Sequence, residues 1–354
     1  MKIGIVTHPL LGNYGGILQN FALQQVLKKL GYSPITIDYL PYTTTLVGYI
    51  LASIKSLLLF FTPKRRRFRP YRLHRSKPFD SFVQNHIVLT KTYANYTSSV
   101  INEYQLDALI TGSDQVWRPM YVNDIDAMFL GFAESNSIKK ISYAASFGVD
   151  TWEYSEEETK HCKKLAHMLD VVTVRESSGV KLCKQYLDVE ATEVLDPTLL
   201  LDKEDYNSIC AHIPVASESF LASYVLDLTP EKQNYIERIA VDLGLPLKIF
   251  GVDQNMTLSV EEWLAMFRDA SFIITDSFHG SVFSLIYNKP FIAIGNGERG
   301  LSRFYSLLDK FSLSGRLVTS LASVDLFSMP LINWEHVNDR RKALKDLSLR
   351  FLQF

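Results

Sequence analysis

The sequence predicts an α/β protein with two Rossmann-like domains, each built on a parallel sheet, that face each other across a cleft. The chain has 354 residues, of which 47% are hydrophobic, and this is enough to bury two cores. Short apolar segments of strand length alternate with segments whose apolar residues recur at helical spacing. The alternation occurs twice, on either side of a stretch without a clear period.

The first domain is expected at residues 1–200. The chain enters a buried strand at 2–7, and a loop then leads to a helix at 17–30 that Gly31 ends. A strand at 35–40 completes a βαβ unit, whose crossover is expected to be right-handed. Further buried strands are expected at 107–113, 139–148, 170–176 and 191–201, with helical stretches between the later ones.

The second domain is expected at residues 201–354, and it begins with a linker or short cap at 201–219. Its strands are predicted at 220–228, 247–251, 272–275 and 291–294. Its helices are predicted at 230–243, 260–267 and 280–287. This order is typical of a second Rossmann-like sheet. A helical tail at 338–354 could cross back onto the first domain.

The composition excludes several classes of protein. The formal net charge of -1 provides no overall basic field, so no nucleic acid partner is expected. Cys162, Cys183 and Cys210 lie far apart and outside any metal-ligand spacing, which indicates free thiols in a reducing compartment. The sequence shows no metal constellation and no catalytic Ser-His-Asp or cysteine motif, so neither a metal nor a cofactor is expected.

The N-terminus enters a strand without the features of a signal peptide, so we expect the protein in the cytoplasm. A helical basic insertion is predicted at about 43–80. Its apolar run at 46–61 is too short to span a bilayer, and the basic segment 64–75 follows it. An insertion packed on its own domain, with a solvated basic flank, is the favoured interpretation. The alternative is peripheral contact of residues 46–75 with the inner face of an anionic membrane.

Ligands of open parallel sheets bind beyond the carboxyl ends of the strands, so the residues that directly follow each strand are the candidates for function. The first such loop, HPLLGNYGG, lacks the spacing of a dinucleotide or P-loop signature. Gly15 and Gly16 would allow a ligand close to the backbone, and the Asn13 amide could bind a hydroxyl or an anion. A purely structural turn is the alternative.

The segment GSDQVW follows the strand at 107–113 and suits a sugar, because it offers polar groups beside a flat apolar face. Ser113, Gln115 and Trp117 are its candidate binding residues. Asp114 could accept a proton from an attacking hydroxyl. The alternatives are that Asp114 caps a local turn and that Trp117 belongs to the core.

The most informative strand end has the sequence DSFHGS. Asp276 or Ser277 could cap the following helix, and the first-turn amides near Gly280 and Ser281 could bind a phosphate or carboxylate. His279 would stand at the mouth of that site, where an imidazole can give or take a proton near neutral pH. The alternative is a histidine that only orders the turn.

Three arginines could bind the same anion. Arg175 ends the strand at 170–176 and suits a phosphate or carboxylate, although an ion pair with a neighbouring helix is an alternative. Arg299 and Arg303 follow the last predicted strand, and either could equally be a surface arginine.

The sequence resembles the polysaccharide pyruvyl transferase family over nearly its whole length. The motifs that carry the resemblance are GNYGGILQNFALQ, ITGSDQVW, YAASFG, VRE, VLDPTLLL and EEWLAMFRDASFIITDSFHGSVFSLIYNKPFIAIG. The resemblance implies a glycosyltransferase-B-like fold, phosphoenolpyruvate as donor, and a glycan with two suitably placed hydroxyls as acceptor. The glycan would be a cell-surface polysaccharide or its lipid-linked precursor, and the products would be a pyruvate ketal and phosphate.

The resemblance also assigns Arg175 and His279 to the donor. Some family members have a second arginine two positions before the histidine, where this chain has Ser277. We also expect the first domain to bind mainly the acceptor and the second domain to bind mainly the donor. The catalytic candidates are His279 and Asp114. The donor-binding candidates are Arg175, Ser277, Gly280, Ser281, Arg299 and Arg303. The acceptor-binding candidates are Asn13, Gly15, Gly16, Ser113, Gln115 and Trp117.

Two other functions are compatible with the same pattern. A nucleotide-sugar-dependent glycosyltransferase uses the same two-domain architecture, and it would be protected thermally by a sugar nucleotide rather than by phosphoenolpyruvate. A non-catalytic glycan-binding protein would bind the acceptor without releasing phosphate.

Overall fold

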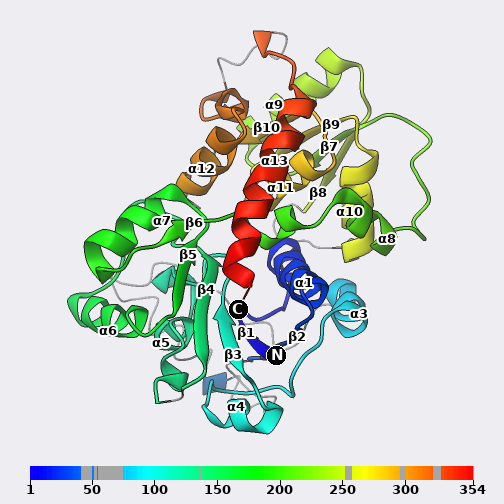
Figure 1. Cartoon of the computed structure of the whole chain (residues 1–354). Coiled ribbons are helices and arrows are strands. Elements are labelled where there is room, and N and C mark those ends of the chain that lie inside the picture. The colour runs from blue at the N-terminus through cyan, green and yellow to red at the C-terminus, as the bar shows by residue number, and fades with distance from the viewer. Residues whose placement is uncertain are drawn as a thin grey trace. The chain divides into compact units, whose positions relative to one another are not determined.

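The chain forms two compact units in a computed structural model, each with its own parallel sheet (Figure 1). The structure describes residues 1–40, 50–51, 54, 75, 77–135, 137–251, 257–295, 300–321 and 328–353. Most of the predicted insertion at 43–80 lies outside these residues, so its membrane contact stays a prediction. Among the helices that the structure does describe, none combines the length and the apolar character needed to cross a membrane.

The N-terminal unit holds a six-stranded sheet in the order β2-β1-β3-β4-β5-β6. Its strands are β1 (Lys2–Val6), β2 (Ser33–Thr36), β3 (Ala108–Thr111), β4 (Lys139–Ala145), β5 (Val171–Val174) and β6 (Thr192–Glu193). All neighbouring pairs are parallel, with Ile5 opposite Ile110 in the central pair. The central strands are almost wholly apolar because a parallel sheet is covered on both faces.

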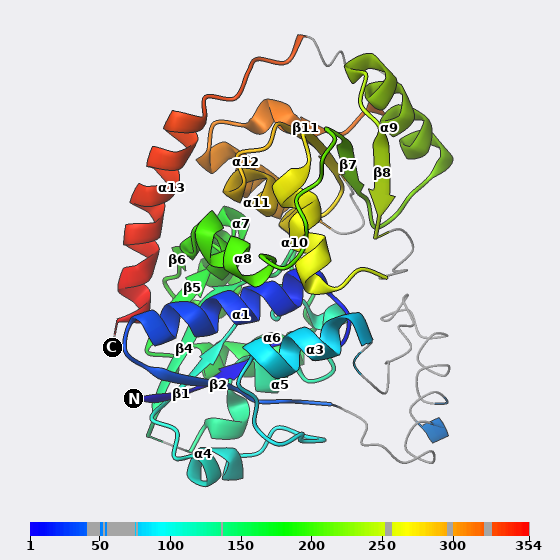
Figure 2. The same cartoon turned by 90° about the vertical axis from the view of Figure 1, so that its right-hand side faces the viewer.

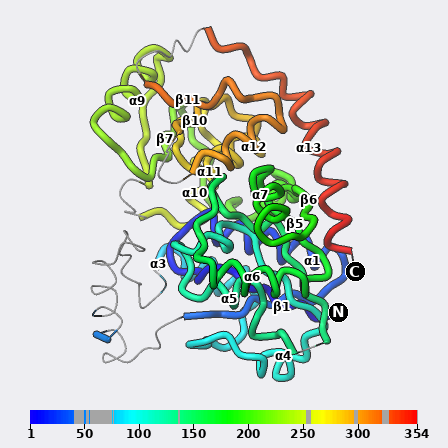
Figure 3. Tube along the Cα trace, turned by 90° about the vertical axis from the view of Figure 1, so that its left-hand side faces the viewer, coloured from blue at the N-terminus to red at the C-terminus, as the bar shows by residue number. Residues whose placement is uncertain are grey.

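Helices flank this sheet. They are α1 (Tyr14–Lys29), α3 (Lys77–His86), α4 (Ser99–Tyr104), α5 (Ile125–Met128), α6 (Glu156–Ala166) and α7 (Ser177–Leu182). Helices α1 and α3 lie side by side, and aromatic contacts from Tyr14 to Phe79 and from Phe21 to Phe82 join them (Figure 2). Helices α5 and α6 are also neighbours, joined by a hydrogen bond between Asp126 and His161 (Figure 3).

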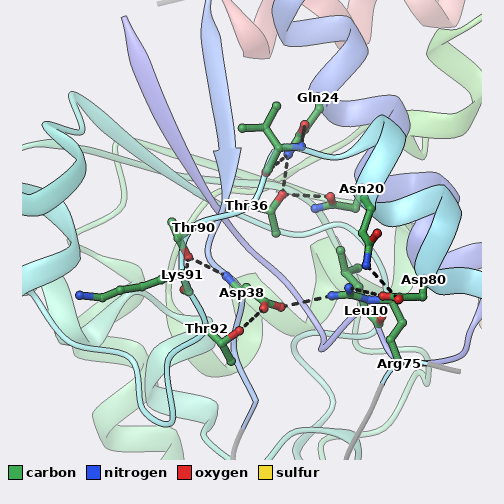
Figure 4. Close-up of polar contacts among 12 residues, drawn as sticks. Leu10, Asn20, Gln24, Thr36, Asp38, Arg75, Asp80, Thr90, Lys91 and Thr92 are labelled. Atoms are coloured by element: carbon green, nitrogen blue, oxygen red, sulfur yellow. Dashed lines mark hydrogen bonds and ion pairs between the residues drawn. The ribbon is translucent and has the colours of Figure 1, made fainter.

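Helix α1 begins earlier than the apolar spacing predicts, at Tyr14 rather than Ile17. The first half of the helix is buried on all sides. The side-chain amides of Gln19, Asn20 and Gln24 therefore occupy buried positions that apolar residues usually fill. Gln24 Nε2 donates to Thr36 Oγ1 over 2.9 Å, and that hydroxyl donates to Asn20 Oδ1 over 2.9 Å (Figure 4). These bonds tie α1 to the end of β2, and a hydrophobic periodicity cannot predict them.

Arg75, which ends the predicted basic segment, is held within the N-terminal unit. Its Nε donates to the Leu10 carbonyl over 2.8 Å, and its guanidinium lies 3.5 Å from Asp38 and 3.3 Å from Asp80 (Figure 4). Thr92 Oγ1 donates to the other oxygen of Asp38 over 2.6 Å. The prediction of a solvated basic flank is therefore wrong for Arg75, because its charge is paired inside the unit.

The C-terminal unit holds a five-stranded parallel sheet in the order β11-β10-β9-β7-β8. Its strands are β7 (Leu221–Tyr224), β8 (Leu247–Phe250), β9 (Phe272–Thr275), β10 (Phe291–Ile294) and β11 (Leu317–Val318). Its helices are α8 (Lys203–Ile209), α9 (Pro230–Leu243), α10 (Val260–Asp269), α11 (Phe278–Ile286), α12 (Ser302–Lys310) and α13 (Trp334–Leu349). Two units of this kind confirm the predicted class of two Rossmann-like α/β domains.

The boundary between the units differs from the one predicted at residue 200. The C-terminal unit begins at Val194 and also includes residues 148–150 and 176–178. The strand predicted at 191–201 is only β6, because Asp196 and Pro197 start a short 3-10 helix, Pro197–Leu200. Tyr206 donates its hydroxyl to the Thr198 carbonyl over 2.8 Å, which holds this helix in the C-terminal unit.

Two further segments of the C-terminal unit differ from or refine the prediction. The linker predicted at 201–219 contains helix α8, whose start is marked by a bond from the Asp202 amide to Asp205 over 3.0 Å. Helix α13 packs within the same unit, where Arg341 donates to the Leu201 carbonyl and Ser348 Oγ accepts from the Leu195 amide.

Asp276 connects three segments at the end of β9. Its carboxylate is fully buried and accepts hydrogen bonds from the amides of Leu226 and Asp227. It also lies 2.7 Å from Lys232 Nζ, a nearly buried ammonium on α9. The pair places opposite charges where neither is well hydrated, so each depends on the other.

Replacing Asp276 with Asn should lower the free energy of unfolding by about 3–5 kcal/mol, because Lys232 is left as a buried charge without its counter-ion. Urea unfolding of the full chain measures this loss. The control is Asp188→Asn, which breaks the exposed pair with Lys163 and should leave the midpoint unchanged. Equal midpoints for both variants would contradict the role of Asp276.

Candidate functional site

In the N-terminal unit, the structure brings together two candidates from different strand ends. Asp114 follows β3 and adopts a left-handed φ of 69°, which Asp tolerates better than most residues. Arg175 follows β5, and its guanidinium lies 3.2 Å from Asp114 Oδ1. Both side chains are at least nine-tenths buried. A carboxylate and a guanidinium therefore form one charged cluster at the carboxyl edge of this sheet.

Gln19, which sequence reasoning missed, joins the loops after β1 and β3 to the first turn of α1. Its Oε1 accepts a hydrogen bond of 3.0 Å from the Ser113 amide. Its Nε2 donates to Thr7 Oγ1 and to the Gly16 carbonyl. The only signal in the sequence was an amide inside the apolar pattern of α1, which periodicity alone treats as a surface residue.

The glycine loop has a different local structure from the one predicted. Gly15 and Gly16 belong to the first turn of α1 and are buried. A Cβ at Gly16 would lie 3.3 Å from Asn13 Nδ2, so this glycine makes room for the Asn13 side chain. Asn13 is exposed and does not use its side chain to cap the helix. Asn13 therefore has an exposed side chain, and its contact with a ligand stays a prediction.

Trp117 is a core residue, so its predicted role as a sugar platform is wrong. The indole is fully buried and stacks on Phe129 with 4.5 Å between ring centroids. Its Nε1 donates to the Met128 carbonyl over 3.0 Å. Ser113 is likewise buried, and its hydroxyl donates to the Ala144 carbonyl, so its predicted contact with a sugar is also wrong. The apolar residues after β3 are therefore part of the hydrophobic core of the N-terminal unit.

Gln115 remains a candidate in the same segment. Its side chain is 8% exposed, and its Nε2 has no hydrogen-bond partner among the described residues. Buried amide donors are usually satisfied, so this nitrogen is suited to a ligand oxygen.

In the C-terminal unit, Ser277 caps helix α11, and its hydroxyl accepts a bond of 3.4 Å from the Gly280 amide. A Cβ at Gly280 would lie 2.1 Å from Thr275 Oγ1, so glycine lets α11 pack against the end of β9. Ser281 is fully buried and donates its hydroxyl to the Ser277 carbonyl. Gly280 therefore fits α11 against the strand, and the Ser281 hydroxyl bonds within the helix; the donor contacts of the Ser277, Gly280 and Ser281 residues stay predictions.

His279 faces a carboxylate that sequence reasoning did not select. His279 Nε2 lies 3.5 Å from Asp196 Oδ2, and both side chains are buried. The other oxygen of Asp196 accepts bonds from the Thr198 amide and from Thr198 Oγ1, at 3.0 and 2.6 Å. The available signal was Asp before Pro at the start of a helical turn, which is typical of a capping residue.

Arg303 on α12 packs beside Phe278, the residue that precedes His279 in the chain. Its guanidinium is 5.5 Å from the centre of the Phe278 ring, which is itself 5.2 Å from the His279 ring. Arg303 is 7% exposed and so is not an ordinary surface arginine. Arg299 lies outside the described residues, and its predicted contact stays a prediction.

A comparison with protein-family models decides the family. The model for polysaccharide pyruvyl transferase matches residues 13–298, which is most of the chain. The chain belongs to the polysaccharide pyruvyl transferase family. The matched range includes Asp114, Arg175, Asp196 and His279 and ends before Arg303. No curated protein matches the chain.

Solved structures agree with the fold of this transferase. A UDP-GlcNAc 2-epimerase from Neisseria meningitidis superposes with a TM-score of 0.51 at 8% identity, covering 100% of this chain and 93% of that one. An enzyme of the same name from Methanocaldococcus jannaschii has a TM-score of 0.49 at 11% identity, covering 98% and 93%. An alpha-glucosyltransferase in complex with UDP-glucose and DNA has a TM-score of 0.44 at 10% identity, covering 98% and 90%. The first of these supports a glycosyltransferase-B-like fold and nothing finer.

Each unit of the chain presents a candidate cluster of ionisable groups in which a carboxylate faces a cation or an imidazole. The N-terminal unit has Asp114 with Arg175, and the C-terminal unit has Asp196 with His279. A guanidinium can bind a carboxylate or a phosphate, and an imidazole can deliver a proton. Among the described residues, no group of His, Cys, Asp and Glu could hold a metal ion.

Replacing Trp117 with Ala should lower the free energy of unfolding by about 3–5 kcal/mol, because the change leaves a cavity in the core of the N-terminal unit. Chemical denaturation measures the loss. Asn13→Ala is the control and should leave the unfolding midpoint unchanged, since that side chain is exposed. An unchanged midpoint for Trp117→Ala would return the indole to the list of ligand-binding residues.

Proposed function

We propose that this transferase moves a pyruvyl group from phosphoenolpyruvate to two hydroxyls of one sugar and so forms a pyruvate ketal. The observation that carries the proposal is the buried His279 facing Asp196 at the start of α11, within the range matched by the family. The acceptor is a cell-surface polysaccharide, such as a capsule or exopolysaccharide, or its lipid-linked precursor.

The reaction needs a group that donates one proton to the methylene carbon of the donor. It also needs acceptors for the protons of the two sugar hydroxyls. Protonation of the methylene carbon turns it into a methyl group and leaves the adjacent carbon as an oxocarbenium-like centre. One sugar hydroxyl adds to that centre and loses its proton. The bond to the phosphate oxygen then breaks, and the second hydroxyl adds and loses its proton. One of the two hydroxyl protons replaces the proton given to carbon, and the other leaves on phosphate.

His279 supplies the proton to carbon in this proposal. It is the second residue of α11, next to the Ser277 cap, and the positive end of the helix macrodipole favours an anion there. Arg303 beside Phe278 adds a cation on the same unit. An imidazole at this position can act as the general acid toward an anionic donor bound there.

Arg175 binds an anionic group of the donor, and Asp114 accepts a proton from the sugar. Their contact of 3.2 Å gives Asp114 a second role, because it orients the guanidinium before the donor arrives. Asn13 and Gln115 of the same unit bind sugar hydroxyls; the exposed side chain of Asn13 and the Gln115 Nε2, which has no partner among the described residues, support this. We propose that the reaction occurs in the cytoplasm, and peripheral membrane contact of residues 46–75 is the alternative to an insertion packed on its own domain.

Phosphate release from phosphoenolpyruvate tests the proposed function. The full chain is incubated with the donor and a panel of capsular or exopolysaccharide repeat units, with a sugar nucleotide as the competing donor. The proposal predicts phosphate and a ketal methyl signal only with phosphoenolpyruvate and a suitable repeat unit. Sugar transfer from the nucleotide donor without ketal formation would overturn it.

His279→Ala should lower turnover by roughly 100-fold or more, the usual scale for losing a general acid. The unfolding midpoint should stay close to that of the parent, and both quantities are measured on the same preparation. The control is His212→Ala, an exposed histidine of the same unit, which should turn over at the parent rate. Parent-like turnover in His279→Ala would sink the assignment.

A further inference from the structure

Asp196 is buried beside the proposed acid and is rigidly held. Its side chain is fully shielded from solvent, and it begins the 3-10 helix Pro197–Leu200. The Thr198 amide and hydroxyl both donate to Oδ1, so this oxygen cannot turn away without losing two bonds. The same segment is tied to α13 by the bond from the Leu195 amide to Ser348 Oγ at 3.0 Å. The position of Asp196 Oδ2 is therefore fixed by the fold.

His279 is fixed on the other side of the contact. It sits in the first turn of α11, which the Ser277 cap and the close fit of Gly280 against Thr275 hold on β9. Among the described residues its buried Nε2 has no hydrogen-bond partner, and Asp196 Oδ2 lies 3.5 Å away. Catalytic hydrogen bonds are often this long before a substrate is bound and tighten in the complex.

A carboxylate that faces one ring nitrogen decides where the proton of a neutral imidazole lies. A carboxylate accepts hydrogen bonds, so the nitrogen opposite it must carry a hydrogen. A bare nitrogen at that position would leave two lone pairs opposed inside a buried site. With Asp196 at Nε2, the nitrogen that gains and loses a proton is Nδ1.

We propose that Asp196 is a positioning residue that keeps a proton on His279 Nε2 and leaves Nδ1 as the atom that protonates the donor. The inference rests on the proposed function, in which His279 is the general acid. In the protonated state the two residues form a buried ion pair, and after Nδ1 gives its proton to carbon, the neutral ring still donates from Nε2 to Asp196. Asp196 itself stays ionised throughout.

The Asp196→Asn variant tests this role with a predicted change of tautomer. Thr198 donates two bonds to Oδ1, so the amide oxygen of Asn takes that place and the amino group faces His279. An amino group donates, so Nε2 must become an acceptor and the ring proton must move to Nδ1. In a neutral ring, Nδ1 then holds the resting proton and Nε2 becomes the nitrogen that gains and loses one. In a charged ring, the imidazolium has lost Asp196 as its counter-ion.

Nitrogen-15 NMR of the imidazoles in the full chain reads the tautomer directly. The chain has eight histidines, and the signal that disappears in His279→Ala assigns the one needed. We expect the proton on Nε2 in the parent and on Nδ1 in Asp196→Asn. A parent with its proton on Nδ1 would overturn the inference without the need for any variant to fold.

Kinetics on the same variants separate positioning from structure. Asp196→Asn should lower kcat by about 100-fold with little change in the KM for phosphoenolpyruvate, because the effect falls on proton transfer. The double variant with His279→Ala should be no slower than His279→Ala alone, since Asp196 acts through the histidine. Additive losses would contradict the inference.

Asp202→Asn is the matched control. Asp202 lies in the same segment, and its carboxylate pairs with Arg341 and Lys345. This variant should keep the parent tautomer and the parent kcat.

The two proposals fail in different ways. Full turnover in His279→Ala would refute the proposed function. Loss of turnover in His279→Ala, together with parent tautomer and kcat in Asp196→Asn, would refute only the role of Asp196.

Discussion

Polar side chains buried at the ends of parallel strands, and the hydrogen bonds that satisfy them, are the constraint on which the rest of this structure depends. A buried polar group without a partner costs stability, so each one fixes the backbone that supplies its partner. Gln19 does this in the N-terminal unit, where one amide joins Thr7, Gly16 and Ser113. Asp276 does it in the C-terminal unit, where one carboxylate joins the end of β7 to Lys232 on α9.

The candidate catalytic groups depend on the same constraint. Asp114 and Arg175 form an ion pair at the ends of β3 and β5. Thr198 holds one oxygen of Asp196, and the other oxygen faces His279. A charged group that is held in this way needs no reorganisation when a charged substrate arrives, and this is the main source of electrostatic catalysis. The fold and the candidate site of this transferase therefore both depend on buried polar side chains that are held by hydrogen bonds and ion pairs.

The sequence predicted the strands and the fold class well, because buried parallel strands are nearly continuous apolar runs. Strands β9 and β10 and helix α9 begin and end where the pattern places them. The pattern failed where burial and polarity coincide. Trp117 follows a strand and has a polar handle, yet its ring belongs to the core, and nothing in its neighbours distinguishes the two cases.

The residues missed in the candidate site share a physical reason. Asp196 contacts His279 and Gln19 contacts Ser113, and both partners lie far away in the sequence. Patterns of neighbouring residues cannot predict such long-range pairs. His279 itself was found because its own local context, a strand end followed by a helix, is enough to suggest an anion site. Local context selects a candidate residue, whereas the partner that orients its side chain is known only from the fold.

The identity of the donor is the central claim, and calorimetry of the full chain tests it most directly because no acceptor is needed. The chain is titrated with phosphoenolpyruvate and, separately, with UDP-N-acetylglucosamine. The account predicts saturable binding of phosphoenolpyruvate and none of the sugar nucleotide. Binding of the sugar nucleotide with no heat from phosphoenolpyruvate would contradict it.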